Sequence, residues 1–183
     1  MRVLQFIFLG LVMSALQVEA QQIFVSDSSR VVFYSHTPIE DIEAYNEAGT
    51  SILNIAKSEA TFRVPIRGFQ FAHALMQEHF NENYMDSEKF PHATFKGKLS
   101  DLLNVTIDTL YHVAATGLMN IHGVDYAAPY TGTLETRGDT IFINSEFSVF
   151  LSHHNIKVPR VVFSNIAEEI KVKIFFRYVP YKE

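Results

Sequence analysis

The feature that most constrains the fold is an alternation of apolar and polar residues, with a period of two, along most of the chain. In one segment Phe62, Val64 and Ile66 alternate with Arg63 and Arg67, and five other segments repeat the pattern. Side chains on a β-strand point alternately to its two faces, so this period is typical of a strand buried on one side. The sequence therefore predicts a mainly β protein of seven to nine antiparallel strands.

The face opposite the apolar one is charged, and this limits how the strands close. Lys96, Lys98 and Lys173 lie on that face. An outer-membrane barrel needs an apolar outward face in contact with lipid, so these charges disfavour that class. We expect a barrel, or a sandwich, with an apolar interior. Cys is absent, which excludes a disulfide scaffold and leaves burial to hold the fold together.

A few segments break the strand pattern. One of them predicts a helix of about three turns, whose inner face would carry Ala72, Leu75, Met76, His79, Phe80 and Asn83. A second short helix is expected at residues 164–169. Pro65 cannot donate a ladder hydrogen bond, which predicts an edge or bulged strand there. The R-G-D sequence at residues 137–139 predicts a hairpin tip.

The first twenty residues form a separate segment. Arg2 is followed by an apolar run over residues 3–13, and Val18 and Ala20 supply a small-residue exit. This pattern is typical of a secretory signal peptide, with a buried N-terminal helix as the alternative. We predict cleavage near Ala20, one domain over residues 21–183, no integral membrane segment in the mature chain, and a periplasmic or secreted location.

Charge and motifs argue against several functions. The formal net charge is -5, whereas nucleic-acid binders are typically basic, so we expect no nucleic-acid partner. The eight His residues show no metal-ligand spacing, and no nucleophile elbow occurs. Glu78 and Glu82 share a helix face and could act as acid and base, although a solvated helix face is the simpler interpretation. We predict no catalytic residue, no metal and no cofactor; the acidic charge is compatible with a homodimer.

The chain has 16 Phe, and their place in the strands leaves two interpretations open. They could fill the barrel with a solid core, or line a barrel that holds one apolar ligand. Small residues share the predicted inner face with them (Ser35, Ala93, Gly97, Ala115 and Gly117), which favours an unfilled interior. The predicted ligand-binding wall consists of Val31, Phe33, Phe62, Val64, Phe95, Val113, Met119, Phe147 and Val149, with Leu75, Met76 and Phe80 at the mouth.

Two motifs resemble a known family. Residues 89–95 read K-F-P-H-A-T-F and follow the predicted helix; residues 119–124 read M-N-I-H-G-V. Together they resemble the YceI-like family of exported lipid-binding proteins, in particular the form found in Bacteroidetes. The sequence departs from the family pattern at residues 125–127, which read D-Y-A where the family has T-K-P, and at residues 153–156. The resemblance implies an extended, lipocalin-like antiparallel β-barrel, a long isoprenoid or similar lipid in its pore, and no catalysis.

The sequence thus leads to a main hypothesis and two alternatives. The main hypothesis is non-enzymatic binding, storage or transport of an apolar amphiphile, with a polyisoprenoid lipid as the expected ligand and partner. One alternative is a structural or interaction module of the cell envelope with a solid core, which predicts no interior cavity. The other is a hydrolase or isomerase that uses Glu78, Glu82 or a His, which predicts a polar, water-accessible pocket.

Overall fold

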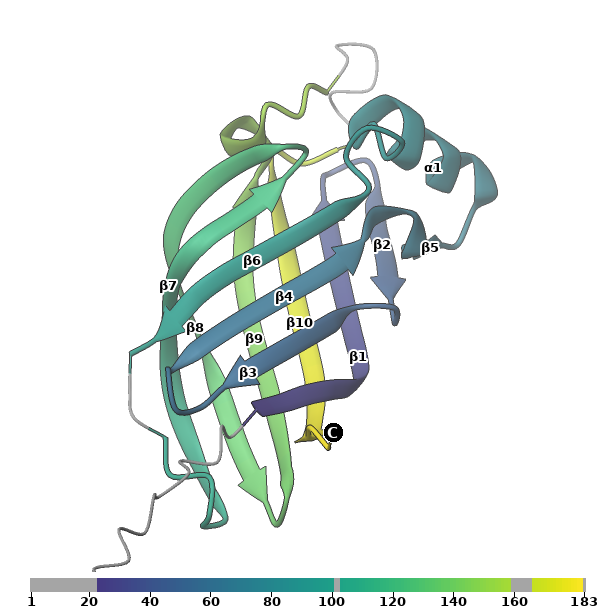
Figure 1. The fold of residues 1–183 in the computed structure, drawn as a ribbon. Coiled ribbons are helices and arrows are strands. Elements are labelled where there is room, and N and C mark those ends of the chain that lie inside the picture. Colours follow the sequence, from purple (N-terminus) through teal and green to yellow (C-terminus); the bar gives the residue numbers. More distant parts are fainter. Residues whose placement is uncertain (1–22, 101–102, 159–165, 183) are drawn as a thin grey trace, which may run out of the picture.

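The computed structural model describes residues 23–100, 103–158 and 166–182, so the predicted signal peptide lies outside the described residues. The described chain is mainly β (Figure 1). Its elements are β1 (Ile23–His36), β2 (Asp41–Asn46), β3 (Thr50–Asn54), β4 (Glu59–Pro65), η1 (Ile66–Gly68), β5 (Gln70–Phe71), α1 (Ala74–His79), η2 (Phe80–Tyr84), β6 (His92–Leu99), β7 (Thr109–Ile121), β8 (Val124–Arg137), β9 (Thr140–Phe150), η3 (Leu151–His154) and β10 (Glu169–Pro180).

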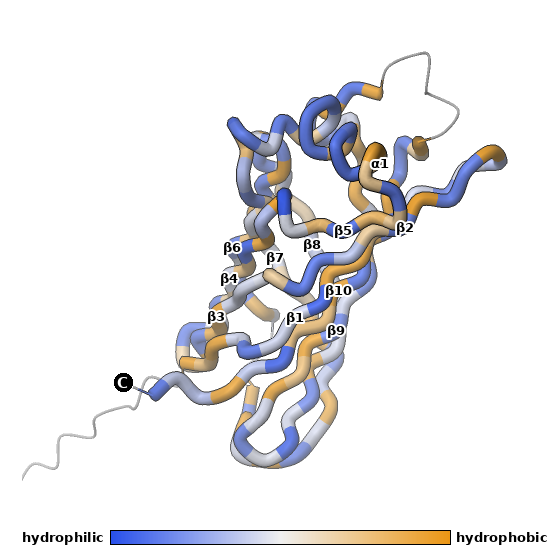
Figure 2. Tube along the Cα trace, turned by 90° about the vertical axis from the view of Figure 1, so that its right-hand side faces the viewer, coloured by the Kyte–Doolittle hydropathy of each residue, from blue (hydrophilic) through white to orange (hydrophobic). Residues whose placement is uncertain are grey.

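The strands form a closed antiparallel barrel, as the alternation predicted. Eight of them follow the order β10-β9-β8-β7-β6-β4-β3-β1, and the pairing of β1 with β10 closes the ring. β2 and then β5 continue the sheet beyond β1. Figure 2 shows apolar and polar residues alternating along these strands. We call the end that carries the β8–β9 turn the hairpin end, and the end that carries α1 the helix end.

A bend in β1 makes the two ends different. Ile23–Val25 of β1 pairs with β3, whereas Val31–His36 pairs with β2. The register with β10 shifts between Ser26 and Ser28, which marks a bulge, and bulges bend a strand and re-aim its side chains. Asp27 at the bulge accepts two hydrogen bonds from Arg177, at 2.8 and 2.9 Å. β1 therefore leaves β3 at the bulge and carries β2 and β5 outward at the helix end.

The hairpin end has a solid core. Leu53, Leu134 and Ile141 are fully buried there, together with Tyr178. The Tyr178 hydroxyl donates to Ser51 Oγ at 2.7 Å, and Ser51 Oγ donates to the carbonyl of Thr61 at 2.9 Å. Burial raises the pKa of Tyr178 well above its ordinary value. Its polar atom is thus satisfied inside an otherwise apolar layer, as a buried hydroxyl requires.

The predicted helix is present, with a local change of geometry. α1 covers Ala74–His79, and the chain continues as one π-helical turn over Phe80–Tyr84. A π turn adds a residue, so the face that points inward shifts along the sequence. Asn83, predicted on the inner face, is exposed, and Tyr84 takes its place. Ala72 precedes the helix and is exposed as well.

The other local predictions divide between right and wrong. Gly138 occupies the β8–β9 turn with φ +56, which confirms the hairpin tip. Pro65 is not at an edge: it is the last residue of β4, which lies between β3 and β6, and the strand ends where the missing N–H would matter. The helix expected at residues 164–169 is wrong for its described part, because Glu169 begins β10; residues 164 and 165 lie outside the described residues. Within the described ranges no helix is both long and apolar enough to cross a membrane.

Candidate binding cavity

The barrel is hollow toward its helix end. A cavity of about 560 Å³ lies between the strands there, within the range of about 300–1,000 Å³ that is typical of small-molecule sites. Phe176 and Ala60 belong to its wall and also to the buried core, so they form the boundary between the hollow and solid parts. A solid-cored module required an interior without a cavity, and this cavity contradicts that alternative.

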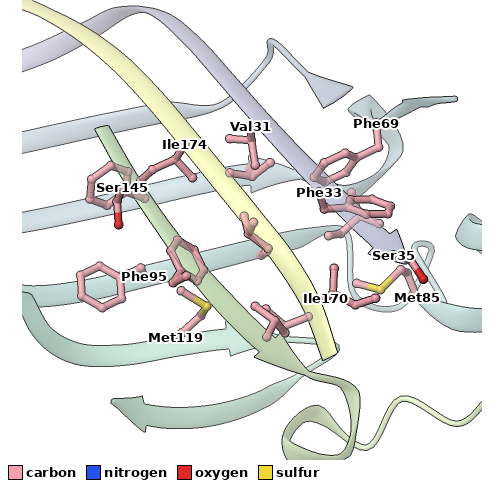
Figure 3. Close-up of a pocket in the computed structure, with 18 of the residues that line it drawn as sticks. Val31, Phe33, Ser35, Phe69, Met85, Phe95, Met119, Ser145, Ile170 and Ile174 are labelled. Atoms are coloured by element: carbon pink, nitrogen blue, oxygen red, sulfur yellow. The ribbon is translucent and has the colours of Figure 1, made fainter. Parts of the chain in front are cut away.

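The predicted wall residues come together around the cavity. Figure 3 labels four of them at the cavity, Val31, Phe33, Phe95 and Met119. All twelve line it: Val31, Phe33, Phe62, Val64, Leu75, Met76, Phe80, Phe95, Val113, Met119, Phe147 and Val149. They come from β1, β4, β6, β7, β9 and the α1–η2 helix. The alternation therefore located the inner face of these strands.

A cluster of Phe rings attaches the helix to the barrel wall. The Phe33 ring on β1 has its centroid 5.2 Å from Phe69, 5.7 Å from Phe71 and 5.4 Å from Phe80. Phe80 is also 5.1 Å from Phe71. Such tilted and edge-on pairs contribute about 0.5–1.5 kcal/mol each beyond their burial. Phe69 and Phe71 were missed from the sequence, although their i, i+2 spacing is the same strand signal on a very short element.

A second row of aromatic rings crosses the wall from β4 to β9. Ring centroids are 6.1 Å apart for Phe62 and Phe95, 5.5 Å for Phe95 and Tyr130, and 5.0 Å for Tyr130 and Phe147. Burial, followed by the nearby Tyr126, raises the pKa of Tyr130 above its ordinary value. Tyr130 was also missed, because the inner face of β8 carries Ala128 and Gly132 beside it and so shows little apolar contrast.

Two of the small residues predicted on the inner face do not create volume. Gly97 and Gly117 are cross-strand partners in the β6–β7 ladder and are absent from the cavity wall. A Cβ on Gly117 would lie 2.3 Å from the Lys96 carbonyl oxygen, and a Cβ on Gly97 would lie 2.5 Å from the Phe95 ring. These glycines allow close backbone and ring contact instead. Ser35, Ala93 and Ala115 do line the cavity.

Two hydroxyls of the cavity wall are hydrogen-bonded to the protein's own backbone. Ser35 Oγ accepts a hydrogen bond from the Ala167 N–H at 2.8 Å, and Ser145 Oγ donates to the Thr131 carbonyl at 2.5 Å. Among the described residues, no Lys or Arg lines the cavity. The carboxylate and imidazole groups that do so come from Glu40, His73 and His79. His73 precedes the helix and has extended backbone, and both it and His79 border the cavity.

The two carboxylates considered for catalysis lie elsewhere. Glu78 and Glu82 are exposed and border a small surface hollow beside Arg67, not the barrel cavity. Over residues 23–100, 103–158 and 166–182, no three His, Asp or Glu side chains are placed so that they could hold a metal ion. Apart from Glu40, His73 and His79, the cavity wall therefore offers mainly shape and apolar contact.

Comparison with known proteins identifies the family of this barrel. The model of the YceI-like domain matches residues 24–178. The chain belongs to the YceI-like family. The family prediction made from residues 89–95 and 119–124 is thereby confirmed, while the Bacteroidetes form stays a prediction. No curated protein matches the chain.

Solved structures show the same YceI-like fold. A polyisoprenoid binding domain from Saccharophagus degradans, implicated in plant cell wall breakdown, is 14% identical with a TM-score of 0.72, over 86% of this chain and 98% of that one. BcnA of Burkholderia cenocepacia is 16% identical with a TM-score of 0.68, over 81% and 95% of the two chains. The Campylobacter jejuni YceI protein is 13% identical with a TM-score of 0.56, over 100% of both. At such identities the likeness is one of fold.

Proposed function

We propose that this YceI-like protein binds an apolar amphiphile in its barrel and stores or carries it, with a polyisoprenoid lipid as the ligand. The observation that carries the proposal is the cavity of about 560 Å³, whose wall is built from Phe, Val, Ile and Met side chains with no described Lys or Arg. Such a surface gains little from a polar solute, and it gains from any chain that replaces water against the rings.

Burial alone suffices for useful affinity. Each buried methylene contributes about 0.8 kcal/mol, so ten of them contribute roughly 8 kcal/mol before the costs of binding. Lost motional freedom takes back part of this, and a longer chain restores it. Micromolar affinity corresponds to about 8 kcal/mol, so with a binding cost of about 4–15 kcal/mol a chain of roughly 15 to 29 buried carbons reaches it without any polar contact. This is why the lack of a Lys or Arg in the described wall does not argue against tight binding.

A polyisoprenoid is the ligand class that best suits the wall. The neighbouring Saccharophagus degradans structure is described as a polyisoprenoid binding domain. A methyl-branched chain presents small projections, and the wall offers Ala93 and Ala115 beside the large rings of Phe62 and Phe95. The predicted signal peptide, cleaved near Ala20, makes the periplasm or the exterior the place where the protein would act.

We favour binding over catalysis because the predicted acid and base do not reach the ligand. Glu78 and Glu82 lie on the exposed side of the helix, whereas general acid–base catalysis needs hydrogen-bond reach to the reacting atoms. A hydrolase or isomerase activity would have to use other groups, such as His73 or His79 of the cavity wall, and the cavity's hydroxyls of Ser35 and Ser145 are engaged with backbone atoms.

Adjacent residues on β7 give a matched test. Ala115 lines the cavity, and its neighbour Ala114 points to the outer face of the same strand. We expect Ala115→Phe to reduce affinity for a fluorescent C20 isoprenol at least tenfold, because the added ring takes up ligand volume, and Ala114→Phe to leave it unchanged. Fluorescence titration of the mature protein measures both. Equal affinity in the two variants, or no binding by the parent protein, would contradict the proposal.

A further inference from the structure

The barrel wall is not continuous between β8 and β9. β8 pairs with β7 from Thr136 to Val124, and β9 pairs with β10 as far as Phe150. The two strands pair with each other only between Gly132–Arg137 and Thr140–Ser145. Figure 1 shows β8 curving away from β9 beyond their shared hairpin. We call the unpaired stretch, residues 124–131 of β8 facing residues 146–150 of β9, the seam.

The sequence explains where the pairing stops. Counted from the hairpin, Gly132 is the last residue of β8 that pairs with β9. A Cβ on Gly132 would lie 2.4 Å from the Asn144 carbonyl oxygen, so this close approach of the two strands needs glycine. Three residues away, Pro129 has no N–H, and proline is confined to strand positions that need no ladder bond on that side. Between them the Thr131 carbonyl is bonded by the Ser145 side chain at 2.5 Å. A side-chain bond thus replaces the first missing rung.

Side chains, rather than backbone hydrogen bonds, close the seam. The Tyr130 ring on β8 meets the Phe147 ring on β9 edge-on, with centroids 5.0 Å apart. Nearer the helix end, Tyr126 stacks on His153 at 4.1 Å, and His154 Nδ1 donates to the Val124 carbonyl at 3.1 Å. Side chains change rotamer in picoseconds to nanoseconds where they are exposed, whereas opening a ladder needs several backbone bonds to break together. The seam is therefore the part of this wall that can open at least cost.

The cavity reaches the seam. Thr131 and Ser145, which stand where the ladder ends, both belong to the cavity wall, as do Tyr130 and Phe147. Thr131 is also exposed on the outside. The open helix end, by comparison, is lined by the Phe33, Phe69, Phe71 and Phe80 cluster, which ties the helix to β1 and β5. A long chain could thus slide sideways between β8 and β9 without threading past those rings.

We propose that the seam is a lateral portal through which the apolar chain of the lipid enters and leaves the cavity. The inference rests on the proposed lipid binding and adds its route. The class of ligand it suits is a long chain lipid whose polar end stays in solvent while its tail passes the Tyr130–Phe147 contact.

The absence of Cys from the chain makes a selective cross-link possible. The seam is stapled in the double variant Ala127→Cys with Ser148→Cys, using a short bis-methanethiosulfonate reagent. The matched control is Thr133→Cys with Asn144→Cys, which lie opposite each other in the paired part of the same two strands. Stopped-flow fluorescence measures uptake and release of the C20 isoprenol probe by each stapled protein, before and after reductant removes the staple.

We expect the seam staple to slow uptake and release at least tenfold each, to leave the dissociation constant unchanged, and to be reversed by reductant. The control staple is expected to change neither rate. Unchanged rates in the seam-stapled protein would overturn the portal and direct entry to the helix end. Slow rates that persist after reduction would overturn it as well, because they would indicate damage rather than closure. Failure of the parent protein to bind the probe would instead refute the proposed function itself.

Discussion

The two halves of the barrel carry the same sequence pattern and use it differently. In the hairpin half, Leu134, Ile141 and Tyr178 are fully buried and belong to one packed cluster. In the helix half, Phe33 and Phe147 follow the same period-two pattern and point inward, but they remain half-buried around a cavity. The difference lies in how the strands close: β1 leaves β3 for β2, and β8 separates from β9, so the helix half is wider. Alternation fixes which way a side chain points, and the pairing decides whether it meets another.

The largest expected effect contrasts truncations in the two halves. Leu134→Ala removes side-chain atoms from a solid layer, and we expect it to lower the free energy of unfolding by about 3 kcal/mol. Met119→Ala shortens a half-buried residue that already borders a cavity, so we expect a loss of about 1 kcal/mol, toward the low end for such changes. Urea denaturation measures both. Equal losses would mean that the two halves are packed alike.

Binding measurements on Leu134→Ala and Met119→Ala also distinguish the two halves of the barrel. Met119→Ala is expected to weaken binding of the isoprenol probe, because Met119 lines the cavity. Leu134→Ala is expected to leave the affinity of the folded fraction unchanged, because Leu134 belongs to the core without lining the cavity. A variant in the hairpin half that weakened binding as much as Met119→Ala would break the division.

A smaller contrast concerns the hydroxyls of two tyrosines, the fully buried Tyr178 and the half-buried Tyr130. Tyr178 donates to Ser51 at 2.7 Å, so we expect Tyr178→Phe to cost about 1–2 kcal/mol of unfolding free energy, the usual cost of removing one partner of a buried hydrogen bond. Tyr130 has only the Met119 sulfur at 3.8 Å, so Tyr130→Phe is expected to change stability by less than about 0.5 kcal/mol. Thermal unfolding of both variants tests this, and a reversed order would show that polar satisfaction does not separate the halves.

The smallest effect is a pH dependence from His154 beside the seam. Burial is the main cause that lowers the pKa of His154 below its ordinary value of 6.5, and His153 and His122 add to it. The unfolded chain therefore takes up this proton at a higher pH than the folded one. Stability is fully present above about pH 6.5 and falls as the pH drops below it.

A matched pair of variants isolates this titration. We expect His154→Gln to flatten the decline in unfolding free energy between pH 7 and pH 5, whereas His112→Gln, at an exposed position of β7, is expected to retain it. Denaturant titrations at several pH values give the comparison. A decline that is identical in both variants would assign the pH dependence to other groups.

Much of the fold could be predicted because it depends on local rules. The period-two segments gave the inward faces of β1, β4, β6, β7, β9 and β10, and the 3.6-residue period gave the helix. What the sequence could not give depends on which strands pair. The bulge at residues 26–28 changes the direction of β1, and the alternation of apolar and polar residues does not predict it.

Proline shows how a local signal needs its context. Pro65 predicted an edge strand and stands instead at the end of an interior one, where no further rung is required. Pro129 lies in the middle of β8 and does mark an unpaired side. The two prolines differ in how far they lie from the end of their strand, and strand ends are the part of secondary structure that a sequence predicts least well. Together with Gly132, three residues further along the chain, Pro129 was the sequence feature from which the seam could have been predicted.

The most direct test of the central claim, that the helix half of the barrel encloses a lipid, is to analyse what the protein carries. The full chain is expressed in a bacterial host, purified without detergent, extracted with organic solvent and examined by mass spectrometry, in parallel with Ala115→Phe. We expect a stoichiometric polyisoprenoid in extracts of the parent protein and a strongly reduced amount in extracts of the variant. A parent protein that is free of lipid, and that also fails to take up added isoprenol, would contradict it.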